Sequence, residues 1–320
     1  MKRFIIYMYA LLAAMSAGTT AIMGAEPLAV RSGKIVGAES GEPRPLHGVS
    51  LAWHHFADRY YNADVVRTLH RSWGADVIRA AVSVELGDGY LANPRRAMRA
   101  LETVVEACIE EDCYVVIDWH CHHIRTEEAV GFFTEAARRW GDKANVIYEI
   151  YNEPENDTWS EVKAYAERVA AAIREIDPDN IIIVGSPHWD QDVDIAADDP
   201  LTGYGNIAYS FHFYADTHRA ENMERCDYAL SKGLPLIVSE CGAMDHLGGG
   251  EVNYEWWGRW MQWAERNDIG WIAWSLSDKV ETCSMLRHGA PAEGGWGIDD
   301  LKDWSLLVIS SLKQKTNENR

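Results

Sequence analysis

The segment VIYEIYNEP (146–154) decides the fold, because a buried-looking apolar run ends abruptly in two polar residues, Asn152 and Glu153. A second segment, LPLIVSECG (234–242), repeats this arrangement, and its apolar run ends at Glu240. Short apolar runs of this kind are typical of strands that are buried on both faces of a sheet. A charged side chain at the end of such a strand is costly unless it is paired or functional. The two segments therefore predict parallel strands with chemically active carboxyl ends.

Six more segments share this apolar, β-branched character, and amphipathic stretches separate most of them. The expected strands are residues 48–53, 77–82, 114–119, 146–152, 181–185, 207–213, 236–240 and 270–276. The expected helices are residues 94–111, 127–140, 159–176, 219–231, 252–267 and 304–315. Eight parallel strands that alternate with helices predict an α/β fold of the (β/α)8 TIM-barrel type, closed rather than open.

Local signals support this division of the chain. Asn93 before Pro94 is typical of a helix N-cap followed by proline at the first helical position. Asp157 and Thr158 offer the same capping chemistry before the helix that begins at Trp159. No glycine-rich phosphate loop follows the first strand, which argues against a dinucleotide-binding fold. No linker is visible, so we expect one catalytic domain over residues 26–320.

The N-terminus has the pattern of a signal peptide, which we place at residues 1–25. Lys2 and Arg3 precede an apolar stretch, residues 4–17, that is short for a membrane span, and small residues follow it. An uncleaved anchor is the alternative. Residues 29–45 alternate and carry Gly and Pro, which predicts a short hairpin at the start of the domain. We expect a secreted protein, extracellular or periplasmic, with no membrane contact after cleavage.

Composition narrows the class of partner. The chain has 49 acidic and 30 basic residues and a net charge of −19, so nucleic acid and anionic membranes would repel it. Its 14 Trp and 14 Tyr residues suit the stacking of flat apolar ligands. The six cysteines lack CxxC spacing, and either disulfides or buried free thiols fit an exported protein. We expect a monomer.

Other polar residues end the predicted strands and would meet Glu153 and Glu240 at one mouth of a barrel. They are Arg79, Asp118, His120, Asn152, His212, Tyr214 and Trp274. Two carboxyl groups that flank a glycosidic bond can cleave it, with retention when about 5–5.5 Å separates them. The acid must keep its proton while the nucleophile stays ionised. A nearby cation such as Arg79 would favour an ionised Glu240, and a less polar pocket would raise the pKa of Glu153.

The sequence resembles glycoside hydrolase family 5, cellulase family A, and within it the bacterial endo-β-1,4-glucanases. The resemblance runs in family order from residue 28 to about residue 315. Its segments are LHGVSLAW (46–53), VIRAAV (77–82), VVIDWH (115–120), NVIYEIYNEP (145–154), DPDNIIIVGSPHW (177–189), YSFHFYADTH (209–218), IVSECG (237–242) and WSLSDKVE (274–281). It implies hydrolysis of internal β-1,4-glucosidic bonds in a β-glucan, with retention, through a covalent glycosyl-enzyme intermediate and without a cofactor or metal.

The resemblance also implies a role for each matching residue. Glu153 corresponds to the acid/base and Glu240 to the nucleophile. Asn152 would bind the 2-hydroxyl of the −1 sugar, and Arg79 and Tyr214 would hold and tune Glu240. The remaining candidates would line the −1 site or bind neighbouring sugars, and they are His120, His212, Trp274, Tyr90, Trp189, Lys279 and Glu281.

The chain departs from the family pattern in two places. Cys241 follows the nucleophile where Trp is usual, and the first barrel loop is short after Trp53, with Ala52 where some relatives have His. These changes affect the sugar contacts that the family pattern implies. They leave Glu153 and Glu240 in place.

Several alternatives compete with this interpretation. Within the family, mannan, xyloglucan or mixed-linkage glucan could replace cellulose, and a non-catalytic carbohydrate-binding barrel would use the same fold. His120 to His123 (HCHH) offers zinc-ligand types, but successive strand residues point in opposite directions. The acidic segment 190–199 fits no EF-hand and is expected to be a solvated loop. Cys241 lacks a motif that pairs it with a base. The four tryptophans of the 252–267 helix are expected to pack in the core.

Overall fold

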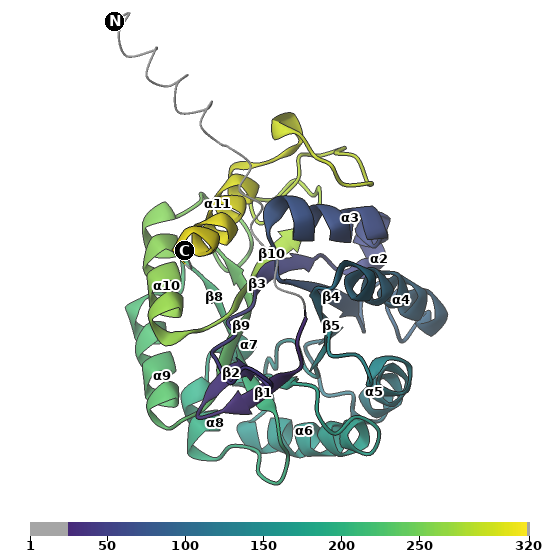
Figure 1. Ribbon diagram of the computed structural model, residues 1–320, viewed down its shortest axis with the longest axis vertical. Coiled ribbons are helices and arrows are strands. Elements are labelled where there is room, and N and C mark those ends of the chain that lie inside the picture. The colour runs from purple at the N-terminus through teal and green to yellow at the C-terminus, as the bar shows by residue number, and fades with distance from the viewer. Residues whose placement is uncertain (1–24, 319–320) are drawn as a thin grey trace, which may run out of the picture.

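The computed structural model describes residues 25–318, and its centre is a closed barrel of eight parallel strands (Figure 1). The expected signal peptide lies outside the described residues except for Ala25. The strands follow one another around the barrel in chain order, and β10 pairs with β3 to close it. The barrel strands are β3 (His47–Leu51), β4 (Val77–Ser83), β5 (Tyr114–His120), β6 (Val146–Glu149), β7 (Ile182–Val184), β8 (Ile207–Tyr214), β9 (Leu236–Gly242) and β10 (Trp271–Leu276).

Helices surround the barrel as an outer layer, as expected for parallel strands that are covered on their outer face (Figure 1). The α-helices are α2 (His54–Ala57), α3 (Ala63–Arg67), α4 (Pro94–Glu111), α5 (Thr126–Trp140), α6 (Trp159–Arg174), α7 (Pro187–Asp190), α8 (Val193–Asp198), α9 (Ala220–Ser231), α10 (Tyr254–Asn267) and α11 (Asp303–Glu318). Shorter helical turns are η1 (Asp58–Tyr60), the π-helix η2 (Thr68–Trp73) and η3 (Ile298–Asp300).

The predicted helix starts are confirmed where capping residues were available. The Asn93 side chain accepts a hydrogen bond from the Arg96 amide at 3.2 Å, and Pro94 occupies the first helical position. Thr158 caps α6, and its backbone amide donates to the Glu161 carboxylate at 2.8 Å. The short segments α2, α3, η2, α7 and α8 were not predicted, because four to six residues are too few to show a helical period.

The predicted hairpin is present and covers the amino-terminal end of the barrel. Strands β1 (Leu28–Arg31) and β2 (Lys34–Gly37) pair antiparallel around a tight turn. The turn needs Gly33, which has φ +75° and lies so near Gly233 that a Cβ would be 2.9 Å from its carbonyl oxygen. Leu28 and Ile35 of the hairpin join the buried cluster of residues inside the barrel. The hairpin therefore closes the end of the barrel that lies opposite the strand carboxyl ends.

A larger apolar core lies between the barrel and its helices. Trp257, Trp260 and Trp263 of α10 are buried in it, as predicted, while Trp256 is half-buried under two arginine side chains. All six cysteines are buried and free, which decides the open question of disulfides in favour of thiols in this structure. Within residues 25–318, no helix has the length and apolar character needed to span a membrane.

Candidate active site

Arg79 is the centre of the polar cluster at the carboxyl ends of the strands. It lies on β4 and is fully buried. Its Nε donates to Glu149 Oε2 at 2.6 Å, and its Nη2 lies 3.0 Å from Asp118 Oδ2. The parallel register makes Asp118 and Glu149 neighbours on β5 and β6. A buried guanidinium is tolerated because several acceptors surround it, so Arg79 fixes these strand ends to one another.

The predicted nucleophile, Glu240, is held by two donors. Arg79 Nη1 donates to its Oε2 at 3.1 Å, and the Tyr214 hydroxyl donates to its Oε1 at 2.7 Å. Burial and the nearby Glu153 raise the pKa of Glu240, while Arg79 and Tyr214 oppose that shift. The carboxylate is therefore fixed in orientation, and it ionises at a higher pH than an exposed glutamate.

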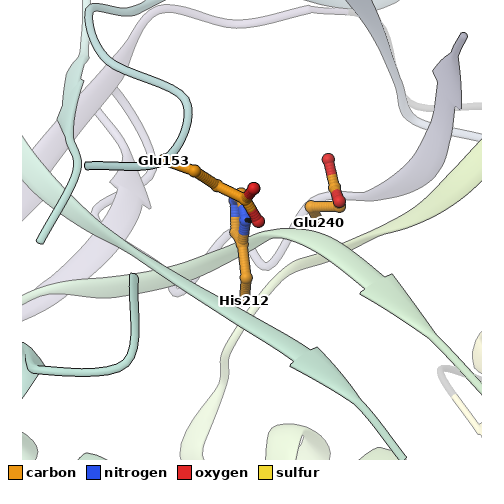
Figure 2. Close-up of side chains that lie close together, drawn as sticks. All are labelled: Glu153, His212 and Glu240. Atoms are coloured by element: carbon orange, nitrogen blue, oxygen red, sulfur yellow. Dashed lines mark hydrogen bonds and ion pairs between the residues drawn. The ribbon is translucent and has the colours of Figure 1, made fainter. Parts of the chain in front are cut away.

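The predicted acid/base, Glu153, lies just beyond the end of β6 and contacts a histidine of β8 (Figure 2). His212 Nδ1 lies 2.8 Å from Glu153 Oε1, as expected for a hydrogen bond. The other carboxylate oxygen, Oε2, lies 3.6 Å from His122 Nδ1. Strand β6 ends at Glu149, three residues before the predicted end, and residues 150–153 lead out of the barrel. This short exit brings Glu153 over the barrel mouth.

The protonation state of Glu153 differs from the expectation for a less polar pocket. Burial would raise the pKa of Glu153, but the hydrogen bond and charge of His212 outweigh burial and lower it. The carboxylates around His212, led by Asp190, raise the pKa of His212 well above its ordinary value despite burial. Glu153 and His212 therefore share one proton as a pair, and the proton is not assigned to Glu153 alone.

Glu153, His212 and Glu240 converge on a small volume (Figure 2). One carboxylate oxygen of each glutamate and one ring nitrogen of His212 all lie within 4.8 Å of one another. This separation is closer to the roughly 5–5.5 Å of retaining glycosidases than to the roughly 6.5–9.5 Å of inverting ones, which place a nucleophilic water molecule between substrate and base. The two carboxylates can therefore act on the two atoms of a single bond, one on its carbon and the other on its oxygen.

Asn152 has a fixed amide with a free donor. Its Oδ1 accepts from Arg79 Nη2 at 2.6 Å, which determines how the amide is turned. In the part of the chain that the structure describes, nothing accepts from its buried Nδ2. An unpaired buried donor costs free energy unless a ligand satisfies it. Asn152 is therefore set to donate to a substrate oxygen beside Glu153, which agrees with its predicted role.

Aromatic rings form one wall of the cleft. The rings of His120 and Trp274 stack with centroids 5.2 Å apart and planes inclined by 13°, and Trp53 lies 4.9 Å from His120. His120 Nδ1 lies 2.7 Å from Asp118 Oδ2. Burial lowers the pKa of His120 well below its ordinary value, so the ring is neutral and Nδ1 carries its proton. This wall is suited to the flat face of a sugar.

Four residues were predicted to bind neighbouring sugars, and two of them line the cleft while two do not. Lys279 and Glu281 line it, and their charged groups pair at 2.9 Å. Tyr90 instead packs against Trp119 and Phe132 of the larger apolar core. The Trp189 side chain is 45% exposed, and its backbone amide donates to Pro154, the residue after Glu153.

A family model for cellulase, glycosyl hydrolase family 5, matches residues 38–280. The chain belongs to glycosyl hydrolase family 5. It is 39% identical over 290 residues to an endoglucanase of Clostridium saccharobutylicum, covering 87% of this chain and 64% of that protein. It is 42% identical over 265 residues to endoglucanase Z of Dickeya dadantii, covering 81% and 62%. The chain thus spans a little over three-fifths of the length of these relatives.

Solved structures of the family agree with the barrel. A structure from Cytophaga hutchinsonii superposes with a TM-score of 0.89 at 39% identity, covering 92% of this chain and 96% of that one. The catalytic domain of Thermobifida fusca endoglucanase Cel5A superposes with a TM-score of 0.84 at 30% identity, covering 90% and 98%. A further structure of that domain holds cellotetraose.

Four residues around this family-5 site were missed as site residues in the sequence. Glu149 holds Arg79, Trp53 extends the aromatic wall, His122 faces Glu153, and Asp190 lies 3.3 Å from His212 Nε2. Glu149 was detectable, because it is the one charged residue inside the apolar run 146–151. Asp190 was not detectable, because the sequence of its segment is typical of a solvated acidic loop.

That expectation for residues 190–199 is wrong. Asp190 is fully buried, and Asp192 is 5% exposed between His188 and Arg225. Farther along, Asp199 pairs with Lys163 at 2.5 Å. The segment folds as α7 and α8 with its carboxylates paired to cations, so it does not offer a free cluster of acidic ligands.

Glu153, His212 and Glu240 are ligand types that could hold an ion. The Arg79 guanidinium lies 3.1 Å from Glu240, where its charge would repel a metal cation. In the HCHH segment, His123 turns away to pair with Glu85 at 3.2 Å, and Cys121 is buried in the core. These contacts favour a family-5 site that works through its own side chains.

Cys241 points away from the site. It is fully buried, and its thiol donates to the Ile272 carbonyl of β10 at 3.4 Å. Burial raises the pKa of the Cys241 thiol well above its ordinary value, so the thiol stays protonated and is a poor nucleophile. The family departure at this position therefore affects packing outside the barrel mouth, not the reacting groups.

Proposed function

We propose that this chain is a retaining endo-β-1,4-glucanase that cleaves internal bonds of a β-1,4-glucan. The observation that carries the proposal is the placement of Glu153 and Glu240 within 4.8 Å of each other, with Arg79 and Tyr214 fixed on Glu240. The relatives named endoglucanase and the cellotetraose complex of a solved relative support the substrate class.

In the first step, a Glu240 oxygen attacks the anomeric carbon of the −1 sugar and the bond to the leaving oxygen breaks. Glu153 gives that oxygen a proton, which the Glu153–His212 pair supplies. Arg79 and Tyr214 hold Glu240 in line for attack, and the free Nδ2 of Asn152 binds the 2-hydroxyl. The product is a glycosyl ester on Glu240 and a shortened chain with a free hydroxyl.

In the second step, Glu153 acts as a base. It takes a proton from a water molecule, whose oxygen attacks the same anomeric carbon and displaces Glu240 as a carboxylate. Two inversions at one carbon give net retention. His212 lies 2.8 Å from Glu153, and the proton taken from water restores the protonated Glu153–His212 pair for the next cycle.

The shape of the site supports attack within a chain. The cleft of about 240 Å³ that contains both glutamates is open, and Lys279 and Glu281 on its rim also line a second hollow of about 810 Å³. An extended polymer could continue from one into the other. Exposed Trp189, whose amide donates to Pro154, offers a further ring for sugars near Glu153.

The test is a reducing-sugar assay of the purified protein on carboxymethylcellulose, barley β-glucan, mannan, xylan and xyloglucan. The proposal expects the highest rate on a β-1,4-glucan, with a rapid fall in viscosity. A higher rate on mannan or xyloglucan would identify that polysaccharide as the substrate instead. Binding without release of reducing ends would identify a non-catalytic carbohydrate-binding barrel. Addition of a chelator should leave the rate unchanged.

We further propose that the protein is exported and acts as a monomer. Lys2, Arg3 and the apolar residues 4–17 support a cleaved signal peptide. N-terminal sequencing of the protein recovered outside the cytoplasm should begin near residue 26, and an intact Met1 in that fraction would contradict cleavage. Light scattering coupled to size-exclusion chromatography should give the mass of one chain.

A further inference from the structure

The turn that begins α7 has an unusual backbone that separates two adjacent side chains. His188, Trp189 and Asp190 all have left-handed φ values, 54°, 56° and 61°. Such a conformation is uncommon and unfavourable for residues other than glycine. The turn exposes the Trp189 ring and fully buries Asp190. A strained segment of this kind persists where its surroundings hold it.

Asp190 is held inside the turn and faces His212. Its Oδ1 accepts from the Ser186 amide at 2.6 Å, which fixes the carboxylate. Its Oδ2 lies 3.3 Å from His212 Nε2. The Trp189 amide donates to the Pro154 carbonyl at 3.0 Å, so the same turn is tied to the residue that follows Glu153. Asp190 and Glu153 thus lie on opposite sides of one imidazole ring.

Among residues 25–318, two carboxylate oxygens on the Nε2 side of His212 have no well-aligned hydrogen-bond donor, although the Ser210 hydroxyl acts on Asp190. They are Asp190 Oδ2, at 3.3 Å from Nε2, and Glu149 Oε1, at 3.9 Å. Unpaired buried carboxylate oxygens are costly unless a positive charge compensates them. Both face the same ring nitrogen, so a positive charge on His212 compensates both at once.

We propose that Asp190 is a positioning residue that keeps a proton on His212 and thereby maintains the proton supply and alignment of Glu153. This inference rests on the proposed role of Glu153 as acid/base. Asp190 does not touch the reacting atoms, because His212 lies between it and Glu153. Its carboxylate acts as the electrostatic anchor of the Glu153–His212 pair.

The other groups around His212 define how much Asp190 contributes. Glu153 faces Nδ1, while Glu149 and the Ser239 hydroxyl share the Nε2 side with Asp190, and Ser239 lies at 3.0 Å. Four more distant residues interact electrostatically with His212: Glu240, Asp118, His120 and His218. Glu149 is already neutralised by Arg79 at 2.6 Å. Burial raises the pKa of Asp190 and His212 opposes that shift, and within the described part of the chain no second cation pairs with Asp190, so its charge depends on His212.

Removing the charge of Asp190 should lower the pH at which the Glu153–His212 pair loses its proton. A negative neighbour favours the protonated pair, and an opposite charge at this distance shifts a pKa by roughly 1–3 units. The alkaline limb of kcat/KM for a polysaccharide reports loss of that proton. Asp190→Asn keeps the size of the side chain and an acceptor for the Ser186 amide. The variant should therefore move the alkaline limb to lower pH by about one unit or more.

The experiment compares pH profiles of wild type, Asp190→Asn and Asp177→Asn. Asp177 is a matched control, because it is fully buried and accepts from the Tyr148 hydroxyl at 2.7 Å, but lies in a loop after α6. The control should lose stability without a shift of the limb. Asp190→Asn should lose more activity on β-glucan than on an aryl glycoside with a good leaving group. An unshifted limb in a folded Asp190→Asn protein would overturn the proposal.

A second measurement needs only the wild-type fold. Nitrogen NMR of ¹⁵N-histidine-labelled protein, with the His212 signals assigned from a His212→Gln spectrum, reads the protonation of the ring directly. We expect an imidazolium at pH 7.5, and a neutral ring would contradict the inference even if Asp190→Asn fails to fold. The two failures are distinguishable, because an imidazolium in a protein without glucanase activity would reject the proposed function and not the His212–Asp190 pairing.

Discussion

Arg79 Nη1 donates to Glu240 Oε2 over 3.1 Å, and both side chains are buried at the mouth of the barrel. The same guanidinium reaches Glu149 and Asn152, each at 2.6 Å. One side chain thus fixes the proposed nucleophile, a strand-end carboxylate and the amide beside the proposed acid/base. The planar fork of arginine suits this task, since each nitrogen has a different partner.

Arg79→Lys should damage both stability and activity. Lysine keeps the charge but cannot reach Glu149, Glu240 and Asn152 together, so at least one buried carboxylate loses its partner. We expect a loss of about 3 kcal/mol in the free energy of unfolding and a fall in kcat of about 100-fold or more. Chemical denaturation and steady-state kinetics measure both. Exposed Arg168→Lys is the control, and an Arg79→Lys protein with wild-type kcat would refute the tethering role.

Glu240→Ala should abolish turnover on β-glucan, by about 10⁴-fold or more, since no group remains to form the covalent intermediate. The truncated side chain leaves space beside Tyr214 and Arg79, where azide can bind and attack the anomeric carbon. Added azide should restore cleavage of an activated aryl glycoside and give a glycosyl azide. The α-anomer of that azide is expected, because one inversion replaces two. Activity that survives without azide would rule out Glu240 as the nucleophile.

Glu153→Ala should discriminate between leaving groups. General acid catalysis contributes about 10²–10⁴-fold for a poor leaving group, so cleavage of β-glucan should fall by that amount. An aryl glycoside whose phenol leaves without a proton should form the intermediate at nearly the wild-type rate. A burst of released phenol followed by slow turnover is the expected time course. Equal losses on the two substrates would remove Glu153 from the acid/base role.

The buried His54 should make the free energy of unfolding fall in mild acid. Burial lowers the pKa of His54 to about 4, and its Nδ1 accepts from the Ser83 amide at 3.0 Å. Between pH 6.5 and 4, the unfolded chain binds a proton there and the folded chain does not. Stability is therefore fully present above pH 6.5 and falls as pH drops through this window, by up to about 3 kcal/mol.

His54→Asn removes this titration and retains an acceptor for Ser83. The free energy of unfolding of the variant, measured by urea denaturation from pH 7.5 to 4, should fall less steeply than that of wild type. Exposed His123→Asn serves as the control variant for loss of an imidazole. Parallel curves for wild type and His54→Asn would show that His54 does not titrate in this window.

Cys241→Ala should retain the activity of wild type within about threefold. The thiol faces the Ile272 carbonyl and not the cleft, and the lost packing around a small side chain costs about 1 kcal/mol. Thiol-alkylating reagents should leave the native enzyme active, because the described cysteines are buried. Loss of activity in Cys241→Ala at full folding would mean that the thiol takes part in the reaction.

The barrel was predictable because its strands are buried on both faces and therefore read as continuous apolar runs. The two glutamates were predictable for the same reason, since each interrupts such a run at its carboxyl end. Arg79, His212 and Tyr214 followed from position on neighbouring strands, and the structure brings all three into contact with a glutamate.

What the sequence did not predict depends on local backbone geometry and on charge coupling. Nothing in the sequence PHWD (187–190) indicates three successive left-handed residues, which alone bury Asp190 beneath His212. The positions of Trp53 and Tyr90 were also not predictable, because the course of the loops decides which ring enters the cleft. Trp53 lines the cleft, whereas Tyr90 packs against Trp119. The direction of the pKa shift of Glu153 could not be predicted from the sequence either. It depends on the positive charge of His212, which Asp190, Glu149 and Glu240 favour.

The most direct test of the central claim is to trap the intermediate with an activated 2-deoxy-2-fluoro-β-cellobioside and to locate the label by peptide mass spectrometry. The fluorine slows both steps, and the good leaving group lets the ester accumulate. The account predicts one label per chain, attached to Glu240, and an increased yield in Glu153→Ala, where release of the ester is slowed. A label on any other residue, or no label with products of inverted configuration, would contradict it.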